Sequence, residues 1–381
     1  VWLSSIGELV TLLESQTRSA RGGSPVFLVN GRRISGFQEI RGLPPEAIDR
    51  FDILPEETAL SYGYRADQRV VNIVLKANFR SLTTQVEYGA PTQRGRSSTE
   101  FENNVLRIEG GTRWSFDLNH ERDSAIFESE RDIDRTLGGA PFDLVGNVTG
   151  LSQDAEIDPA LSALAGGVVT VAAVPAGAGG VTLQDFTQGA GIVRNGDVSA
   201  WRTLTPQREQ IELSGTLKRD LNEQVGATVS VNLEDLDSES YLGLPGVSLT
   251  LDADNPFSPF GTDVLVHRYV DQPEALRRES DARTANVATV LDGYVGDWRW
   301  TATGGYDRVE TESRTGRGVD AAALQALLDG NSPTANPFGD IGGAVTAIPF
   351  DTARSVAGTL NTELVLTGSP FTLPAGDVRT T

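Results

Sequence analysis

Apolar and polar residues alternate along the chain from Phe79 onward, which places them on opposite faces of β-strands. Each alternating run is about ten residues long, the length of a strand that crosses a bilayer, whereas strands of a soluble β-sandwich usually have about five or six residues. We therefore predict a mainly β protein built on a transmembrane antiparallel β-barrel rather than a soluble sandwich. The clearest runs begin at Leu82, Trp114, Ile211, Val225, Trp298 and Val356.

The connections between these runs are alternately short and long. Outer-membrane barrels show the same asymmetry, and their long loops lie outside the cell. We expect about eight or nine barrel strands between Phe79 and Thr381, joined by long extracellular loops. Tight turns are predicted at 109–111, 221–223 and 295–297, and long polar loops at roughly 124–205, 238–278 and 314–351.

Local patterns inside the loops give further predictions. Residues 159–184 are rich in Gly and Ala and broken by Pro175, which favours a flexible loop over a membrane helix. Asn255-Pro-Phe257 and Asn336-Pro-Phe338 are interpreted as turns that tuck a phenylalanine inward. A short helix is predicted at Val319–Leu328.

Short apolar runs separated by turn signals predict a small α/β unit in the N-terminal part of the chain. Asn30-Gly31 favours a hairpin turn, because both residues tolerate positive φ. A unit of this size buries about 60 % or less of its surface, so we expect support from the structure around it. The predicted elements are a helix at Ile6–Ser15, strands at Val26–Val29 and Arg32–Ile34, a helix at Glu46–Arg50, a strand at Phe51–Leu54, one helical turn at Glu56–Ala59 and a strand at Val70–Lys76.

Four sequence blocks in this unit carry a family resemblance. An apolar strand ending in Asn-Gly-Arg is followed by Ile48-Asp-Arg-Phe-Asp-Ile-Leu54, Ala59-Leu-Ser-Tyr-Gly63 and Arg69-Val-Val-Asn-Ile-Val74. In this order and spacing they resemble the plug domain of TonB-dependent receptors of the Gram-negative outer membrane. The sequence departs from the family at Pro55-Glu56, where Lys-Gly is common, and at Arg69, where glycine is usual. The alternative is an unrelated α/β module.

The resemblance implies an organisation and a function. Residues 1–78 would form an N-terminally incomplete plug domain, and residues 79–381 the first strands of a barrel that has about 22 strands in this family. The chain has no Met, and we expect it to be an internal piece of a longer protein. The family imports a scarce solute, such as a siderophore, haem, cobalamin or an oligosaccharide, across the outer membrane.

The partners implied by this function are the solute, outer-membrane lipid and the TonB complex of the inner membrane. The TonB complex would act through a TonB box that is not present in this chain. The alternative function is a non-transporting outer-membrane surface receptor or scaffold.

The amino-acid composition argues against several classes of partner and site. The net charge of -20 argues against a nucleic-acid partner, because phosphate binding needs a basic face. The chain has no Cys and two histidines, His120 and His267, which argues against a zinc site and leaves no disulfide framework. We expect no enzyme activity, no cofactor and no resident metal.

Arginines of the N-terminal unit are the best candidates for functional contacts. We expect them to pair with carboxylates that face the barrel interior, such as Glu87, Asp117 and Glu212. Each such pair would contribute about 0–1 kcal/mol, so the network matters more than any one pair. The candidate residues for ligand or plug–barrel contacts are Asn30, Gly31, Arg32, Arg33, Arg41, Tyr62, Gly63 and Arg65.

Overall fold

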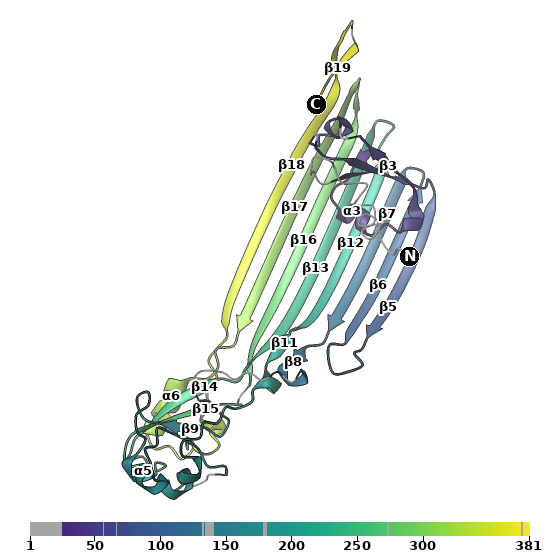
Figure 1. The fold of residues 1–381 in the computed structure, drawn as a ribbon. Helices are drawn as coiled ribbons and strands as arrows, with labels where there is room; N and C mark the ends of the chain where they lie inside the picture. Colours follow the sequence, from purple (N-terminus) through teal and green to yellow (C-terminus); the bar gives the residue numbers. More distant parts are fainter. Residues whose placement is uncertain are drawn as a thin grey trace.

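The computed structural model describes residues 25–381, except 56, 66, 132, 134–140, 178–180, 273 and 375. The predicted helix at Ile6–Ser15 lies outside the described residues. Three parts are visible: an N-terminal unit, a sheet of long strands, and a unit built from loops at the far end of that sheet (Figure 1).

The long strands form one antiparallel sheet of nine strands, each paired with its neighbour along the chain. The sheet is open, with β5 at one edge and β19 at the other, so the predicted barrel is represented by an unclosed sheet. The mainly β prediction is confirmed. The strands are β5 (Phe79–Gly89), β6 (Ser98–Glu109), β7 (Thr112–Asp123), β12 (Gln207–Asp220), β13 (Val225–Gly243), β16 (Leu276–Val295), β17 (Trp298–Thr315), β18 (Asp351–Leu373) and β19 (Gly376–Thr380).

The two faces of this sheet have opposite character. The strand register aligns Val231, Val287, Tyr306 and Leu360 in one row across four strands. These side chains lie on the face turned away from the N-terminal unit, which we call the outer face, and they are all exposed. The inner face carries polar residues at the alternate positions, such as Asn232, which is buried. A stable sheet with large apolar side chains exposed on one face needs an apolar environment there.

The apolar band on the outer face has a defined height. On β13 the outward positions are apolar from Val225 to Leu233, and Asp235 follows at the next outward position. On β17 they run from Trp298 to Tyr306 before Arg308. Each band spans nine residues, which is close to the roughly 9–11 residues with which a tilted strand crosses the hydrocarbon core of a bilayer.

The tight turns lie at one end of the sheet, and the long connections lie at the other (Figure 1). Glycines at positive φ support two of these turns: Gly110 and Gly111 between β6 and β7, and Gly296 between β16 and β17. The predicted separation of short turns from long loops is confirmed.

The N-terminal unit is a four-stranded mixed sheet in the order β2-β1-β4-β3. Asn30 and Gly31 both have positive φ, of 49° and 74°, as the hairpin prediction requires. The unit's elements are β1 (Val26–Val29), β2 (Arg32–Arg33), α3 (Gln38–Arg41), the 3-10 helix η1 (Pro45–Ala47), β3 (Ile48–Leu54), α4 (Glu57–Leu60) and β4 (Val70–Leu75).

One prediction in this unit was wrong, and one short helix was missed. The helix placed at Glu46–Arg50 is only the 3-10 turn η1, because Ile48 already pairs with Leu75 and starts β3. Helix α3 was missed, since four residues are too few to show a helical period.

The core of the N-terminal unit is completed by the long sheet. Buried Ile40, Ile73 and Ala47 cluster with Leu106 and Ile108, which come from β6. As expected for so small a unit, part of its apolar surface is covered from outside.

The long loops do not remain separate. A four-stranded sheet of order β10-β9-β15-β14 combines segments of the first and second loops, and α6 from the third packs on it. We call this the loop unit. It contains β9 (Asn147–Thr149), α5 (Pro159–Ala165), β10 (Val171–Ala173), η3 (Leu183–Gly189), β14 (Gly246–Leu251), β15 (Val264–Tyr269) and α6 (Ala321–Asp329).

The prediction of a flexible loop at 159–184 is therefore wrong for α5 and β10, which are packed into the loop unit. Asp158 caps α5 by accepting hydrogen bonds from the backbone of Ala160 and Leu161. Leu161 and Phe186 are then fully buried in the largest hydrophobic cluster of the described chain. The helix expected at Val319–Leu328 is confirmed as α6, and Asn255 and Asn336 each accept a hydrogen bond from the backbone of the phenylalanine two residues on.

His267 lies in strand β15, although the sequence pattern predicted a long loop at this position. Its Nδ1 is 2.8 Å from Oγ of Ser248, and its Nε2 is 3.0 Å from Oγ1 of Thr149. Phe142 lies edge-on to the ring at 5.8 Å. Burial lowers the pKa of His267 below its ordinary 6.5.

The lowered pKa predicts how the loop unit responds to acid. The folded state resists protonation of His267, so its contribution to stability is present above pH 6.5 and is lost as the pH falls below 6.5. We expect the protection factors of backbone amides in β14 and β15, which are corrected for the intrinsic slowing of exchange by acid, to fall below pH 6.5 in the native protein, and much less in a His267→Gln variant. An equal loss of protection in both would show that other groups cause the acid response.

Among the described residues, no helix is both long and apolar enough to cross a membrane.

Candidate functional site

The N-terminal unit contacts the inner face of the long sheet through charged side chains. Arg41 pairs with Glu212 at 3.1 Å, and Arg33 pairs with Glu363 at 2.7 Å. Arg32 reaches Asp220 at 2.9 Å, and also Asp292 at 3.5 Å. These pairs connect the unit to β12, β16 and β18, so they span much of the width of the sheet.

One ion pair of this interface is buried. Glu39 of α3 pairs with Arg113 of β7, and their side chains are only 3 % and 5 % exposed. Glu39 also accepts hydrogen bonds from the backbone nitrogen and the hydroxyl of Ser35, at 2.7 and 3.0 Å. Two buried charges are tolerated only when each is paired and hydrogen-bonded, so this contact depends on both partners.

The hairpin at Asn30-Gly31 is held from both sides. Asn72 of β4 accepts a hydrogen bond from the backbone nitrogen of Gly31 at 2.7 Å, and Asn30 accepts one from the backbone nitrogen of Leu75 at 2.8 Å. The carbonyl of Gly31 accepts a hydrogen bond from Arg299 of β17 at 2.9 Å. The turn is thereby fixed against the long sheet.

The segment Tyr62–Tyr64 makes a second contact with the sheet. The Arg299 guanidinium lies 4.5 Å from the ring centroid of Tyr62, and the Arg33 guanidinium lies 4.5 Å from that of Tyr64. Burial raises the pKa of the Tyr64 phenol, although the neighbouring Arg33 acts in the opposite direction. A Cβ atom at Gly63 would come within 2.6 Å of the Val365 side chain of β18, and the φ of Gly63 is +76°. Both the close approach and the positive φ therefore favour glycine at this position.

The structure thus gathers most of the candidate residues at one interface, between the N-terminal unit and the inner face. They lie toward the end of the sheet that carries the tight turns (Figure 1). Arg65 differs, because it is exposed and its ion pair, with Asp67, is local.

Two of the three carboxylates expected to pair with these arginines have other surroundings. Asp117 accepts hydrogen bonds from Asn104 and Ser214. Glu87 lies exposed on the edge strand β5. The expected pair between Arg41 and Glu212 is present.

Sequence reasoning missed several residues of the interface. Glu39, Arg113 and Asn72 were not singled out, and neither were the partners Asp220, Asp292 and Glu363. Arg113 stands at an inward position of an alternating strand, which could have marked it. Glu39 gave no such signal, because its helix was not predicted.

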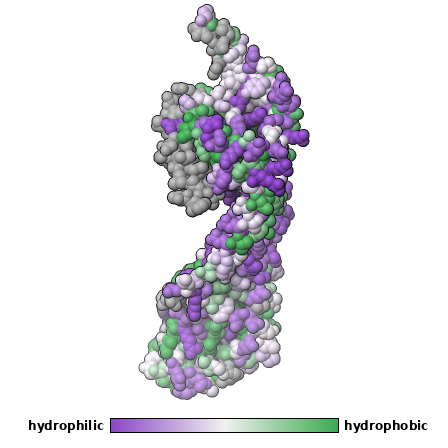
Figure 2. All heavy atoms as spheres, turned by 90° about the vertical axis from the view of Figure 1, so that its right-hand side faces the viewer, coloured by the Kyte–Doolittle hydropathy of each residue, from purple (hydrophilic) through white to green (hydrophobic). Residues whose placement is uncertain are grey.

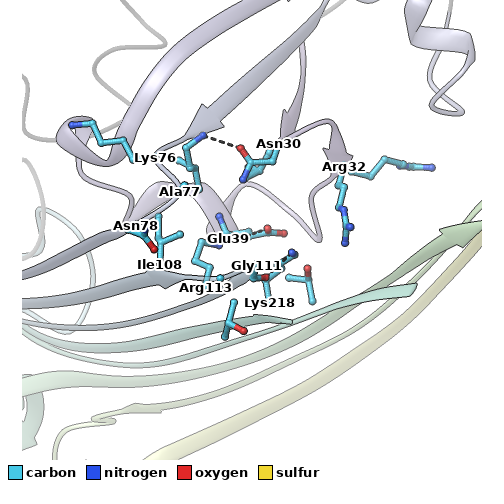
Figure 3. Close-up of a pocket in the computed structure, with 16 residues that line it drawn as sticks. Asn30, Arg32, Glu39, Lys76, Ala77, Asn78, Ile108, Gly111, Arg113 and Lys218 are labelled. Carbon is cyan, nitrogen blue, oxygen red and sulfur yellow. Dashed lines mark hydrogen bonds and ion pairs between the residues drawn. The ribbon is translucent and has the colours of Figure 1, made fainter. Parts of the chain in front are cut away.

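A cavity of about 400 Å³ lies within this interface, near the β6–β7 turn (Figure 3). Asn30, Arg32 and Glu39 line it from the N-terminal unit, while Arg113 and Lys218 line it from the sheet. The Lys218 ammonium donates to the carbonyl of Gly111 at 2.7 Å and to Asp220 at 2.8 Å. Within the described part of the chain, no cluster of acidic, His or Cys side chains is arranged to hold a metal ion.

No protein-family model matches this sequence, and no curated protein sequence matches it either. Structures with some similarity include the ferric preacinetobactin receptor BauA from Acinetobacter baumannii, at 12 % identity over 96 % of this chain and 58 % of that chain, with a TM-score of 0.31. The copper transporter OprC has 11 % identity, coverages of 92 % and 45 %, and a TM-score of 0.30. The ferric-catecholate import receptor Fiu from E. coli K12, in its closed form, has 10 % identity, coverages of 92 % and 49 %, and a TM-score of 0.29.

The chain spans about half the length of these three structures. All three are described as receptors or transporters. Because the TM-scores are low, the proposals below rest on this chain's own residues.

Proposed function

We propose that this chain is part of an outer-membrane receptor that imports a scarce solute. In this proposal the outer face of the long sheet contacts lipid, the inner face lines a hydrated interior, and the N-terminal unit is the plug of that interior. The tight turns would face the periplasm, and the loop unit would face the outside of the cell.

The observation that carries this proposal is the two-faced sheet. Its outer face exposes an apolar band of membrane height, and its inner face holds a charged unit through ion pairs. A soluble protein would have to cover the band with another layer of its own chain. Figure 2 shows both smaller units on one side of the sheet, with a hollow between them.

The resemblance of the four plug blocks supports the finer parts of the proposal. These are coupling to the TonB complex and a solute of the siderophore, haem, cobalamin or oligosaccharide class. The loop unit and the inner face between the two units would be where the solute first binds. A catalytic role forms no part of this proposal.

Membrane insertion can be tested with single cysteines, because the natural chain contains none. Leu360→Cys and Asn361→Cys form a matched pair, since both positions are exposed on β18 and adjacent residues of a strand point to opposite faces. After spin labelling in membranes, we expect the label at 360 to collide with oxygen and the label at 361 with a water-soluble nickel chelate. Equal access of the chelate to both would contradict a lipid-facing outer surface.

A further inference from the structure

The cavity between the N-terminal unit and the long sheet is lined by more basic than acidic residues, although the protein as a whole is acidic. The whole chain has a net charge of -20. The cavity lining nevertheless contains Arg32, Arg33, Lys76, Arg113 and Lys218, against the single carboxylate of Glu39. The carboxylates that pair with Arg32, Arg33 and Lys218, which are Asp220, Asp292 and Glu363, are not part of the lining.

Arg113 lines this cavity and has hydrogen-bonding capacity left. The residue is only 4 % exposed, and its Nη2 donates to Glu39. Its Nη1 is buried, and among the described residues it has no hydrogen-bond acceptor. A buried donor of a charged group without an acceptor is costly, because it has lost its hydrogen bonds to water without gaining a partner. An acceptor supplied by a ligand would remove that cost.

The groups around this donor come from both sides of the interface. In Figure 3 Arg113 and Lys218 of the sheet lie close to Glu39 of α3, while Lys76 points away from them. A guanidinium N–H donor without an acceptor and an ammonium group within one cavity suit an oxyanion, because hydrogen bonds from charged donors to an anion are shorter and stronger than neutral ones. The cavity volume of about 400 Å³ leaves room for more than the oxyanion itself.

We propose that this cavity binds a small soluble molecule carrying a phosphate group, with Arg113 and Lys218 as its main ligands. The phosphate accepts from Nη1 of Arg113 and from Nζ of Lys218, and Glu39 keeps the guanidinium in place through Nη2. The cavity lies on the inner face, on the opposite side of the sheet from the apolar band, which favours a dissolved anion over a lipid headgroup. This inference does not depend on whether the protein imports a solute.

The test is a titration of the purified full chain in neutral detergent with inorganic phosphate and with glycerol 3-phosphate. Ionic strength is held constant with chloride, and binding is followed by ³¹P NMR line broadening and by the midpoint of thermal unfolding. We expect saturable binding and a raised midpoint for the natural chain. Arg113→Gln and Lys218→Gln should each weaken binding by about tenfold or more, because each removes a charge-assisted hydrogen bond.

Arg107→Gln is the matched control. Arg107 lies on the neighbouring strand at the same end of the sheet, but it points to the outer face, pairs with Glu109 and does not line the cavity. It removes the same charge and should leave binding unchanged. Lys218→Gln keeps the proposal testable if Arg113→Gln fails to fold, since the buried pair with Glu39 is then intact.

Three results would overturn the proposal. The first is no saturable binding of either phosphate compound by the folded natural chain. The second is equal weakening by all three substitutions, which would indicate general charge attraction. The third is a signal that requires phosphatidylglycerol in the micelle, which would assign the phosphate to a lipid.

Discussion

Replacing Glu39 by alanine is expected to detach the N-terminal unit from the long sheet. The substitution leaves the Arg113 guanidinium buried without its carboxylate, and it also removes the acceptor of two hydrogen bonds from Ser35. Removing one partner of a buried ion pair typically costs about 3–5 kcal/mol. The whole stability of an ordinary domain is only about 5–15 kcal/mol, so docking of the unit should be largely lost.

Hydrogen exchange followed by mass spectrometry would measure this effect. We expect exchange in β1 and β4 to accelerate strongly in Glu39→Ala, while β13 and β16 change little. The matched control is Glu46→Ala, a substitution of the same kind in the same unit at an exposed glutamate. It should have little effect, because changes at exposed positions without special contacts usually stay within about 0.5 kcal/mol.

The double variant Glu39→Met, Arg113→Met separates the ion pair from the packing around it. Replacing both members of a buried pair by apolar residues is often neutral or stabilising. We therefore expect the double variant to recover much of the stability lost in Glu39→Ala. A double variant as unstable as the single one would mean that Glu39 acts chiefly through Ser35.

The same variants also bear on the proposed function. If the N-terminal unit is a plug, its release in Glu39→Ala should make cells more permeable to antibiotics that do not normally cross the outer membrane. Unchanged permeability together with confirmed detachment in the hydrogen-exchange experiment would favour the alternative of a non-transporting surface receptor or scaffold.

Leu161→Ala should destabilise the loop unit by about 2–5 kcal/mol, the usual cost of removing a large buried aliphatic side chain. Leu161 is fully buried in the cluster that joins segments from all three long loops. A cavity there weakens the contacts by which the loops stabilise one another. We expect faster hydrogen exchange in β9, β14 and β15, with β12 and β13 unaffected.

Leu164→Ala supplies a close control for this prediction. Leu164 belongs to the same helix α5, but its side chain is 51 % exposed. Both substitutions have the same effect on helix propensity, so the difference between them reports burial. If the two variants were equally stable, the loop unit would not have the packed core described above.

Strand periodicity explains why much of the fold could be predicted from the sequence. In a strand the side chains alternate strictly, so runs such as Val225–Leu233 show their two faces without any knowledge of partners. The hairpin at Asn30-Gly31 was predictable for a similarly local reason, since both residues tolerate positive φ.

The loop unit could not be predicted in this way. Its strands β9 and β10 have three residues each, too few to show alternation, and its sheet joins segments such as Thr149 and Leu265 that are far apart in the sequence. The core around Leu161 and Phe186 forms only when the loops meet. A Gly- and Ala-rich stretch was therefore interpreted as flexible although part of it is packed.

The same distinction applies to the interface. That arginines of the N-terminal unit are available for ion pairs could be predicted from the sequence, because their residue type and their place beside predicted turns are local properties. The folded arrangement of the strands determines that Arg33 pairs with Glu363, that Arg65 pairs locally, and that Glu39 is buried against Arg113. The partner of a charge depends on which strands the chain brings together, and an ion pair leaves no periodic trace in the sequence that would reveal it.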